Sequence, residues 1–190
     1  MSPAATHTVA DATAAILDAA DQLFYERGVS AVSVTDIRDR AGVSLRRLYS
    51  LFPGKTDVVS GWLRHRHIRW MQDFSRQIES GLDQGVSPVD AVFDALRNWL
   101  VATDFRGCGF INTLAETGEI TALHRDLIRD HKQSVVQLLD GLPGLKGYGR
   151  PLAVLVDGAI VQASIFATTD PVAAARTAAV ALAEGHKEDS

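Results

Sequence analysis

Apolar residues recur along the chain with the spacing of helices, and no segment alternates with the two-residue period of a strand. Gly28 follows the first apolar stripe and is typical of a residue that ends a helix. Ser33 and Asp36 fit the S-x-x-D/E capping pattern and predict a second, short helix over residues 34–40. The first stripe consists of Ile16, Leu17, Ala20, Leu23 and Phe24.

A third short helix is predicted directly after the second. Gly42 breaks the chain, and Ser44 is a favourable N-cap for a helix over residues 45–52. A proline–glycine turn follows at residues 53–54, and a long helix is expected over residues 55–80.

The rest of the chain is also patterned for helices. Residues 81–87 form the expected break, and Ser87, Pro88 and Asp90 supply a cap, a proline at the first helical position and an acid at the third. We therefore predict an all-α fold of about nine helices, with a first domain at residues 9–55 and a second at 56–185. The further helices are expected at about residues 88–103, 108–118, 121–140, 150–168 and 171–184.

The segment around Gly42 has the spacing of a helix-turn-helix, two short helices joined by a tight turn. A rotation of about 100° per residue divides the third helix into two arcs. The core arc is predicted to hold Leu45, Leu48, Tyr49 and Phe52. The opposite arc is predicted to hold Arg46, Arg47, Ser50 and Leu51. Arginine matches guanine and phosphate, so this arc suits the DNA major groove, although paired arginines are also common on a solvated face.

Charge is divided unevenly along the chain. The net charge is −4, which alone argues against nucleic acid. Residues 38–76 nevertheless carry nine Lys or Arg against three acids, whereas residues 81–190 carry nine against fourteen. This division indicates a basic binding module joined to an acidic one.

Other side chains limit the chemistry that the chain can perform. Cys108 is the only cysteine, so an internal disulfide is excluded and an inert buried thiol in a reducing cytoplasm is expected. His124 and His131 lie two turns apart and are interpreted as solvated, not as metal ligands. No nucleophile–base pair or phosphate loop stands out, so we expect neither an enzyme nor a cofactor. The apolar run at 151–168 is interrupted by polar residues and favours a buried or intersubunit helix over a membrane span.

The helix-turn-helix segment closely resembles the TetR family of bacterial transcriptional regulators over roughly residues 10–60. The similarity lies in the stretches "AGVS" and "LYSLFPGK" at residues 41–44 and 48–55, and "GCGFINTLAE" at 107–116 resembles the sixth helix of many members. Arg38 departs from a usual alanine and is expected either to change the helix packing or to reach a phosphate. Leu51 stands where His or Tyr is frequent and removes one polar contact to the DNA backbone.

The resemblance implies a DNA-binding surface and a role for each of its residues. Tyr49 and Lys55 match the usual phosphate contacts of the family, and Ser33 matches its common Ser or Thr at the start of the second helix. The predicted DNA-binding residues are Ser33, Thr35, Ser44, Leu45, Arg46, Arg47, Tyr49, Ser50 and Lys55.

The resemblance also implies a small-molecule effector, bound in the domain at residues 56–185. Aromatic residues gather near the start of that region, and aromatic side chains line many ligand cavities. Aromatic residues at helical spacing nevertheless belong more often to the hydrophobic core. The candidate ligand-binding residues are Trp62, Trp70, Phe74, Trp99, Phe110, Thr113, Glu116 and Gln162.

The expected helix at 150–168 is apolar nearly all round, and the one at 171–184 also carries apolar residues, so a second subunit is expected to cover both. Together these expectations describe a cytoplasmic homodimeric repressor that binds a palindromic operator and is released by an effector of unknown identity. An activator of the same architecture, or an all-α small-molecule-binding protein or enzyme, is the alternative.

Overall fold

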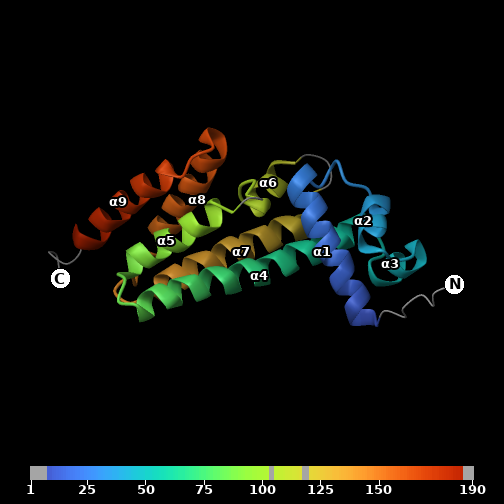
Figure 1. Ribbon diagram of the computed structural model, residues 1–190, viewed down its shortest axis with the longest axis horizontal. Coiled ribbons are helices and arrows are strands. Elements are labelled where there is room, and N and C mark those ends of the chain that lie inside the picture. Colours follow the sequence, from blue (N-terminus) through green and yellow to red (C-terminus); the bar gives the residue numbers. More distant parts are fainter. Residues whose placement is uncertain (1–7, 103–104, 117–119, 186–190) are drawn as a thin grey trace. The chain divides into compact units, whose positions relative to one another are not determined.

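In the computed structural model, which describes residues 8–102, 105–116 and 120–185, every regular element is a helix (Figure 1). The predicted all-α class is confirmed. The helices, in chain order, are α1 (Val9–Arg27), α2 (Val34–Ala41), α3 (Leu45–Leu51), α4 (Lys55–Asp83), α5 (Pro88–Leu100), α6 (Gly109–Ala115), α7 (Ala122–Asp140), α8 (Gly149–Phe166) and α9 (Asp170–Gly185).

Most helix ends lie within three residues of their predicted positions. The long helix α4 continues to Asp83, past the expected end at residue 80, and α5 ends at Leu100 instead of residue 103. The short helix α6 ends at Ala115, before residues 117–119, which lie outside the described part of the chain. The starts agree more closely because each predicted cap, at Ser33, Ser44 and Ser87, does accept a backbone hydrogen bond from the first turn.

The chain forms two compact units, each built from two segments. The first unit comprises Met1–His67 and Gly109–Ile128, and the second comprises Ile68–Cys108 and Arg129–Ser190. Helices α4 and α7 contribute residues to both units. The functional division at residue 55 stays a prediction.

The first unit packs α1, α2 and α3 against one another and against the start of α4. The predicted stripe on α1 supplies its centre, where Phe24 meets Trp62 of α4 edge to face with 5.1 Å between the ring centroids. Ile37 of α2 and Leu48 of α3 are fully buried. Burial of such side chains contributes about 1.5–3 kcal/mol each, so this core fixes where α3 lies.

In the second unit α8 lies beside α9, and α5 packs against both. Leu96, Leu139 and Leu152 are among its fully buried side chains. By length and composition alone α8 is also apolar enough to cross a membrane, and 39% of it is buried inside the structure. Its Asp157 forms an ion pair with Lys132 of α7, with 2.5 Å between Oδ1 and Nζ.

Candidate nucleic-acid interface

The turn before α2 is set by a reciprocal cap. Ser33 Oγ accepts from the backbone N–H of Asp36 at 3.1 Å, while the Asp36 carboxylate accepts from the Ser33 hydroxyl at 2.6 Å and from its backbone N–H at 2.8 Å. These bonds, the hydroxyl first and then the backbone, lower the pKa of Asp36. The carboxylate therefore stays ionised at neutral pH, and α2 begins at a fixed residue.

Helix α3 follows α2 after a left-handed residue, Gly42, with φ 65°. Ser44 then caps α3, because its Oγ accepts from the backbone N–H of Arg47 at 3.1 Å. Leu48 is completely buried and Phe52 is buried at the end of the helix. The predicted helix-turn-helix is thus present, and one side of α3 is docked.

The other side of α3 faces solvent and carries the predicted DNA-facing residues. Arg46 and Ser50 are exposed and Arg47 is half-buried, and the Ser50 hydroxyl donates to the Arg47 carbonyl at 2.7 Å. The core arc was predicted too wide, since Leu45 and Tyr49 are 38% and 46% exposed. Within α3 the buried residue is Leu48. The exposure of Tyr49 agrees with the phosphate contact expected for it.

The remaining predicted DNA-binding residues surround α3 in the first unit. Ser33 and Thr35 are exposed at the start of α2, Ser44 is exposed before α3, and Lys55 is half-buried at the first position of α4. Arg38 is half-buried, and its Nε donates to Oδ1 of its neighbour Asp39 at 2.8 Å.

The candidate ligand-binding residues fall into both units. Trp62, Phe110, Thr113 and Glu116 belong to the first, where Trp62 Nε1 donates to Asp21 at 2.6 Å and the Thr113 hydroxyl donates to the Gly109 carbonyl at 2.7 Å. Glu116 binds backbone amides of residues 29 and 30. In the first unit these candidates are therefore occupied by internal contacts.

In the second unit three of the candidates form one aromatic cluster. Trp70 stacks on Phe74 with 4.5 Å between centroids and meets Trp99 edge to face at 5.8 Å. Phe105 extends the cluster through Trp99 at 5.1 Å, and His131 joins it through Trp70 at 5.4 Å. The fourth candidate of this unit, the exposed Gln162 of α8, is not part of the cluster.

The interpretation of two histidines as solvated is wrong. His124 is fully buried and His131 is 2% exposed. His124 Nε2 lies 3.1 Å from the Thr56 carbonyl, and its Nδ1 accepts from the backbone N–H of Thr121 at 3.3 Å. No local sequence signal distinguishes such a histidine, because Thr56 lies 68 residues away. Among the residues described, no three His, Cys, Asp or Glu side chains gather in a way that could hold a metal ion.

Helices α8 and α9 present a second exposed surface, and this one is apolar. Val154, Ile165 and Phe166 of α8 are each about 65% exposed, and a groove of about 530 Å³ runs between the two helices. We call these exposed residues, with Val161 of α8 and Leu182 of α9, the α8–α9 face. Cavities of this size are ordinary for binding sites, but apolar exposure on this scale is typical of a surface that another protein covers.

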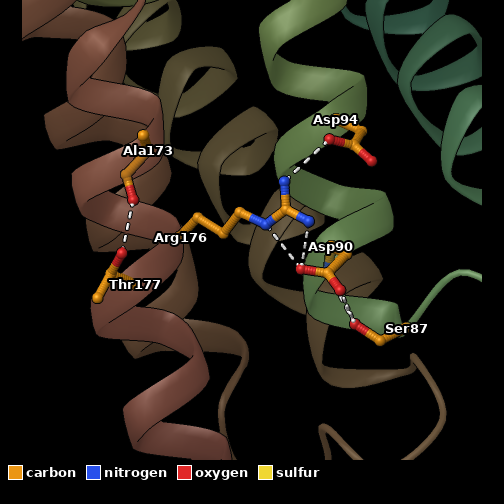
Figure 2. Close-up of polar contacts among 6 residues, drawn as sticks. All are labelled: Ser87, Asp90, Asp94, Ala173, Arg176 and Thr177. Carbon is orange, nitrogen blue, oxygen red and sulfur yellow. Dashed lines mark hydrogen bonds and ion pairs between the residues drawn. The ribbon is translucent and has the colours of Figure 1, made fainter.

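An ion-pair network holds α9 to α5 (Figure 2). Arg176 contacts Asp90 Oδ1 through Nε at 2.7 Å and through Nη2 at 2.6 Å, and Nη1 reaches Asp94 at 3.3 Å. Asp90 also accepts from the Ser87 hydroxyl at 2.8 Å. Hydrogen bonding to Ser87 lowers the pKa of Asp90, and the Arg176 guanidinium lowers it further against the opposing effect of burial.

Comparison with known families finds a match for residues 16–60 only. The model of bacterial regulatory proteins of the tetR family matches this segment, which contains α2 and α3 and the start of α4. No curated protein matches the chain.

Solved structures match over most of the chain. A TetR-family transcriptional regulator from Streptomyces coelicolor is 26% identical, with a TM-score of 0.71 over 96% of this chain and 91% of that one. The reduced form of NemR from E. coli is 18% identical, with a TM-score of 0.76 over 89% and 96%. The multidrug binding protein EbrR, complexed with malachite green, is 19% identical, with a TM-score of 0.71 over 90% and 96%. At 18% and 19% identity the last two show a shared fold.

Proposed function

We propose that this chain, a DNA-binding transcriptional regulator of the bacterial tetR family, acts as a repressor that a small-molecule effector releases from its operator. The observation that carries the proposal is the geometry of α3. Leu48 holds one side in the core, and Arg46 projects from the other side into solvent. A guanidinium in the major groove pairs with guanine O6 and N7 through two hydrogen bonds, which gives sequence discrimination. We assign base contacts to Arg46, Arg47 and Ser50, with Leu45 beside them.

Phosphate contacts set the orientation of such a helix without selecting sequence. We assign them to Tyr49, Lys55, Thr35 and Ser44. Ser44 accepts from α3 and thereby keeps its own hydroxyl proton for a phosphate. The Ser33 hydroxyl already donates to Asp36, so we expect Ser33 to act by orienting α2.

Binding to a palindromic operator requires two copies of α3, and the α8–α9 face supplies the dimer contact in our proposal. Val154, Val161 and Ile165 recur along one side of α8, at a spacing that places them in one row. A second copy of the same face would cover this row in a two-fold arrangement. Gln162, which lines the α8–α9 groove, then belongs to the dimer contact and not to the effector site.

For the effector site we propose the aromatic cluster of the second unit. Trp70, Phe74 and Trp99 supply large flat apolar surfaces, and the buried His131 adds a polar group beside them. The similar protein EbrR was solved with malachite green, which supports a small-molecule site in this fold. An effector acts as a releasing ligand if it binds more tightly to the conformation that has low DNA affinity.

Selection of bound duplexes from a random DNA pool tests the proposal. We expect an inverted repeat whose half-sites lie about one helical turn apart, as two α3 helices in successive major grooves require. An operator that overlaps the promoter supports repression, and an upstream operator supports activation. Failure to enrich any sequence at low salt, where phosphate contacts are strongest, would favour the all-α binding protein or enzyme. A cytoplasmic location is part of the same proposal.

A further inference from the structure

Glu116, at the end of the α6 segment, is bound to the turn between α1 and α2. Its Oε1 accepts from the backbone N–H of Val29 at 2.8 Å, and its Oε2 accepts from that of Ser30 at 2.6 Å. These amides lie 87 and 86 residues away along the chain. Three residues further on is Ser33, the cap of α2. The carboxylate therefore fixes the backbone from which the helix-turn-helix begins.

The turn is shaped to admit this carboxylate. Gly28 ends α1 with φ 84°, a conformation that favours glycine. A Cβ at Gly28 would stand 3.0 Å from Glu116 Oε1, tighter than ordinary contact. Burial alone would raise the pKa of Glu116, but the hydrogen bonds from Ser30 and Val29 and the charge of Lys55 together lower it. The side chain is thus held in its acceptor-only form at neutral pH.

The opposite end of α6 is also fastened to α1, through Arg66 of α4. Arg66 Nη1 donates to Asp21 at 2.6 Å, and its guanidinium lies 3.8 Å from the centre of the Tyr25 ring. Arg66 also lies against Gly109, the first residue of α6, where a Cβ would stand 2.8 Å from Nε. Two contacts, one at each end of α6, therefore connect this helix to α1 and to the turn that follows.

The two contacts differ in how easily they separate. The contact at the Gly109 end depends on Arg66, which is held to Asp21 of α1 by a sheltered ion pair with 12% and 21% of the side chains exposed, so Arg66 itself is fixed beside Gly109. Ser30 is exposed, and water can replace Glu116 on its amide. The Glu116 contact is the one that a displacement of α6 can open.

We infer that Glu116 is a positioning residue for DNA binding, whose carboxylate holds the α1–α2 turn in the arrangement that presents α3. This inference rests on the proposed function. Glu116 touches no DNA in this scheme and is not part of the effector site. It acts through Val29 and Ser30 on the start of α2.

The test uses Glu116→Gln, which keeps the size of the side chain and one acceptor oxygen, and Glu116→Asp, which keeps the charge but shortens the reach. The matched control is Glu26→Gln. Glu26 is an exposed acid of α1 in the same unit, and its ion pair with Arg27 is long, at 4.0 Å. All three variants and the wild type are assayed against the selected operator, and their melting temperatures and dimerisation are recorded.

The sign of the affinity change separates a positioning role of Glu116 from a simple effect of its negative charge. Loss of a carboxylate near a DNA-binding surface strengthens DNA binding by simple electrostatics, and Glu26→Gln is expected to leave the affinity unchanged or slightly higher. Glu116→Gln removes the same charge but is expected to weaken operator binding about tenfold, because the lost hydrogen bonds to a charged group loosen the turn. Glu116→Asp is expected to weaken it as well.

Amide exchange gives a second result that needs no DNA. In both Glu116 variants, exchange at residues 29 and 30 is expected to accelerate about tenfold or more, while the α1 amides keep their wild-type rates. Unchanged exchange at these two amides would overturn the inference, and so would faster exchange with wild-type operator affinity. If the wild type selects no DNA, the proposed function fails, and the positioning role fails with it. Exchange then still reports whether the contact holds the turn.

Discussion

Two exposed helix faces, on α3 and on α8, differ in polarity and in what holds them. Helix α3 is seven residues long, is capped by Ser44 and is docked by Leu48, and its open side carries cations. Helix α8 is eighteen residues long, packs against α5 and α9, and leaves Ile165 and its neighbours exposed. Exposure alone therefore does not identify a partner. The cationic face suits a polyanion, whereas the apolar face suits another protein surface.

The difference also shows which face depends on local sequence. Caps within the segment position α3, since Ser33 and Ser44 bond amides three residues away. Arg176 of α9, by contrast, binds Asp90 and Asp94 of α5, which lie more than 80 residues away along the chain. The caps of α2 and α3 can therefore be predicted from a short stretch of sequence, whereas the partners of Arg176 cannot.

The largest effect is expected from charges on the α8–α9 face. The double variant Val154→Glu, Ile165→Glu places four carboxylates in the seam of a dimer. Burial of each aliphatic side chain contributes about 1.5–3 kcal/mol, so the loss should weaken self-association more than about a hundredfold. Sedimentation velocity at micromolar protein should then show monomers, and operator affinity should fall with the dimer.

The control for this variant is Val101→Glu, because Val101 ends α5, is 62% exposed and lies outside the α8–α9 face. It should remain dimeric. If the double variant were also dimeric, the second copy would bind elsewhere, and the apolar face of α8 would need another partner.

A smaller effect is expected on the cationic face. Arg46→Ala should weaken operator binding by about 1–3 kcal/mol, the value of a bidentate contact to a base, without changing dimerisation or helix content. Fluorescence anisotropy with the selected duplex measures it, and repetition over a salt series separates base from phosphate contacts. A lost phosphate contact makes the slope of log affinity against log salt concentration shallower by about one unit. A lost base contact leaves this slope unchanged and relaxes the sequence preference.

Arg76→Ala removes the same charge from the second unit. Arg76 is 70% exposed, and its ion pair with Asp73, one helical turn away, is exposed as well, so its removal should cost little stability. Equal losses for Arg46→Ala and Arg76→Ala would mean that total charge, and not the geometry of α3, governs DNA binding.

The parts of the fold that sequence predicted are those whose causes are local. The caps at Ser33, Ser44 and Ser87 and the stop at Gly28 each depend on residues within one turn. Helical periodicity gave the class of the fold for the same reason. Even here the width of the buried arc on α3 was wrong, since Tyr49 is exposed where rotation alone placed it in the core.

The misplaced residues depend on distant partners. Glu116, a candidate for the ligand site, binds the turn at Val29, and His124, which was expected in water, is buried against Thr56. Periodicity reports which side of a helix is apolar, but it does not report which backbone amide or carbonyl from another segment meets a polar side chain. The aromatic candidates were predicted as one group, but Trp62 belongs to the first unit and Trp70 to the second.

The smallest effect is expected from the ion pair that supports the apolar face, with Arg176→Met. At pH 7 the variant should melt about 1–4 °C lower, because a partly exposed ion pair contributes no more than about 1 kcal/mol to the free energy of unfolding. The pKa of Asp90 lies below its ordinary value of 3.8, so its ionised form stabilises the fold above that pH and the contribution is lost as pH falls through the lower folded value. The difference between variant and wild type should therefore shrink as the pH falls below 3.8 and vanish once Asp90 is protonated in the folded protein.

Arg97→Met, at an exposed arginine of the same helix α5, is the control and should show no such pH dependence. If the difference in melting temperature between Arg176→Met and the wild type persisted at low pH, the ion pair would not be its cause. The cause would then be packing of the aliphatic stem of Arg176 between α5 and α9. In that case both the support of the α8–α9 face and the face itself would be apolar. If the difference vanishes, α9 is held as α2 is held at Ser33, by a carboxylate whose ionised form is hydrogen-bonded, and only the exposed surfaces of the two regions differ in kind.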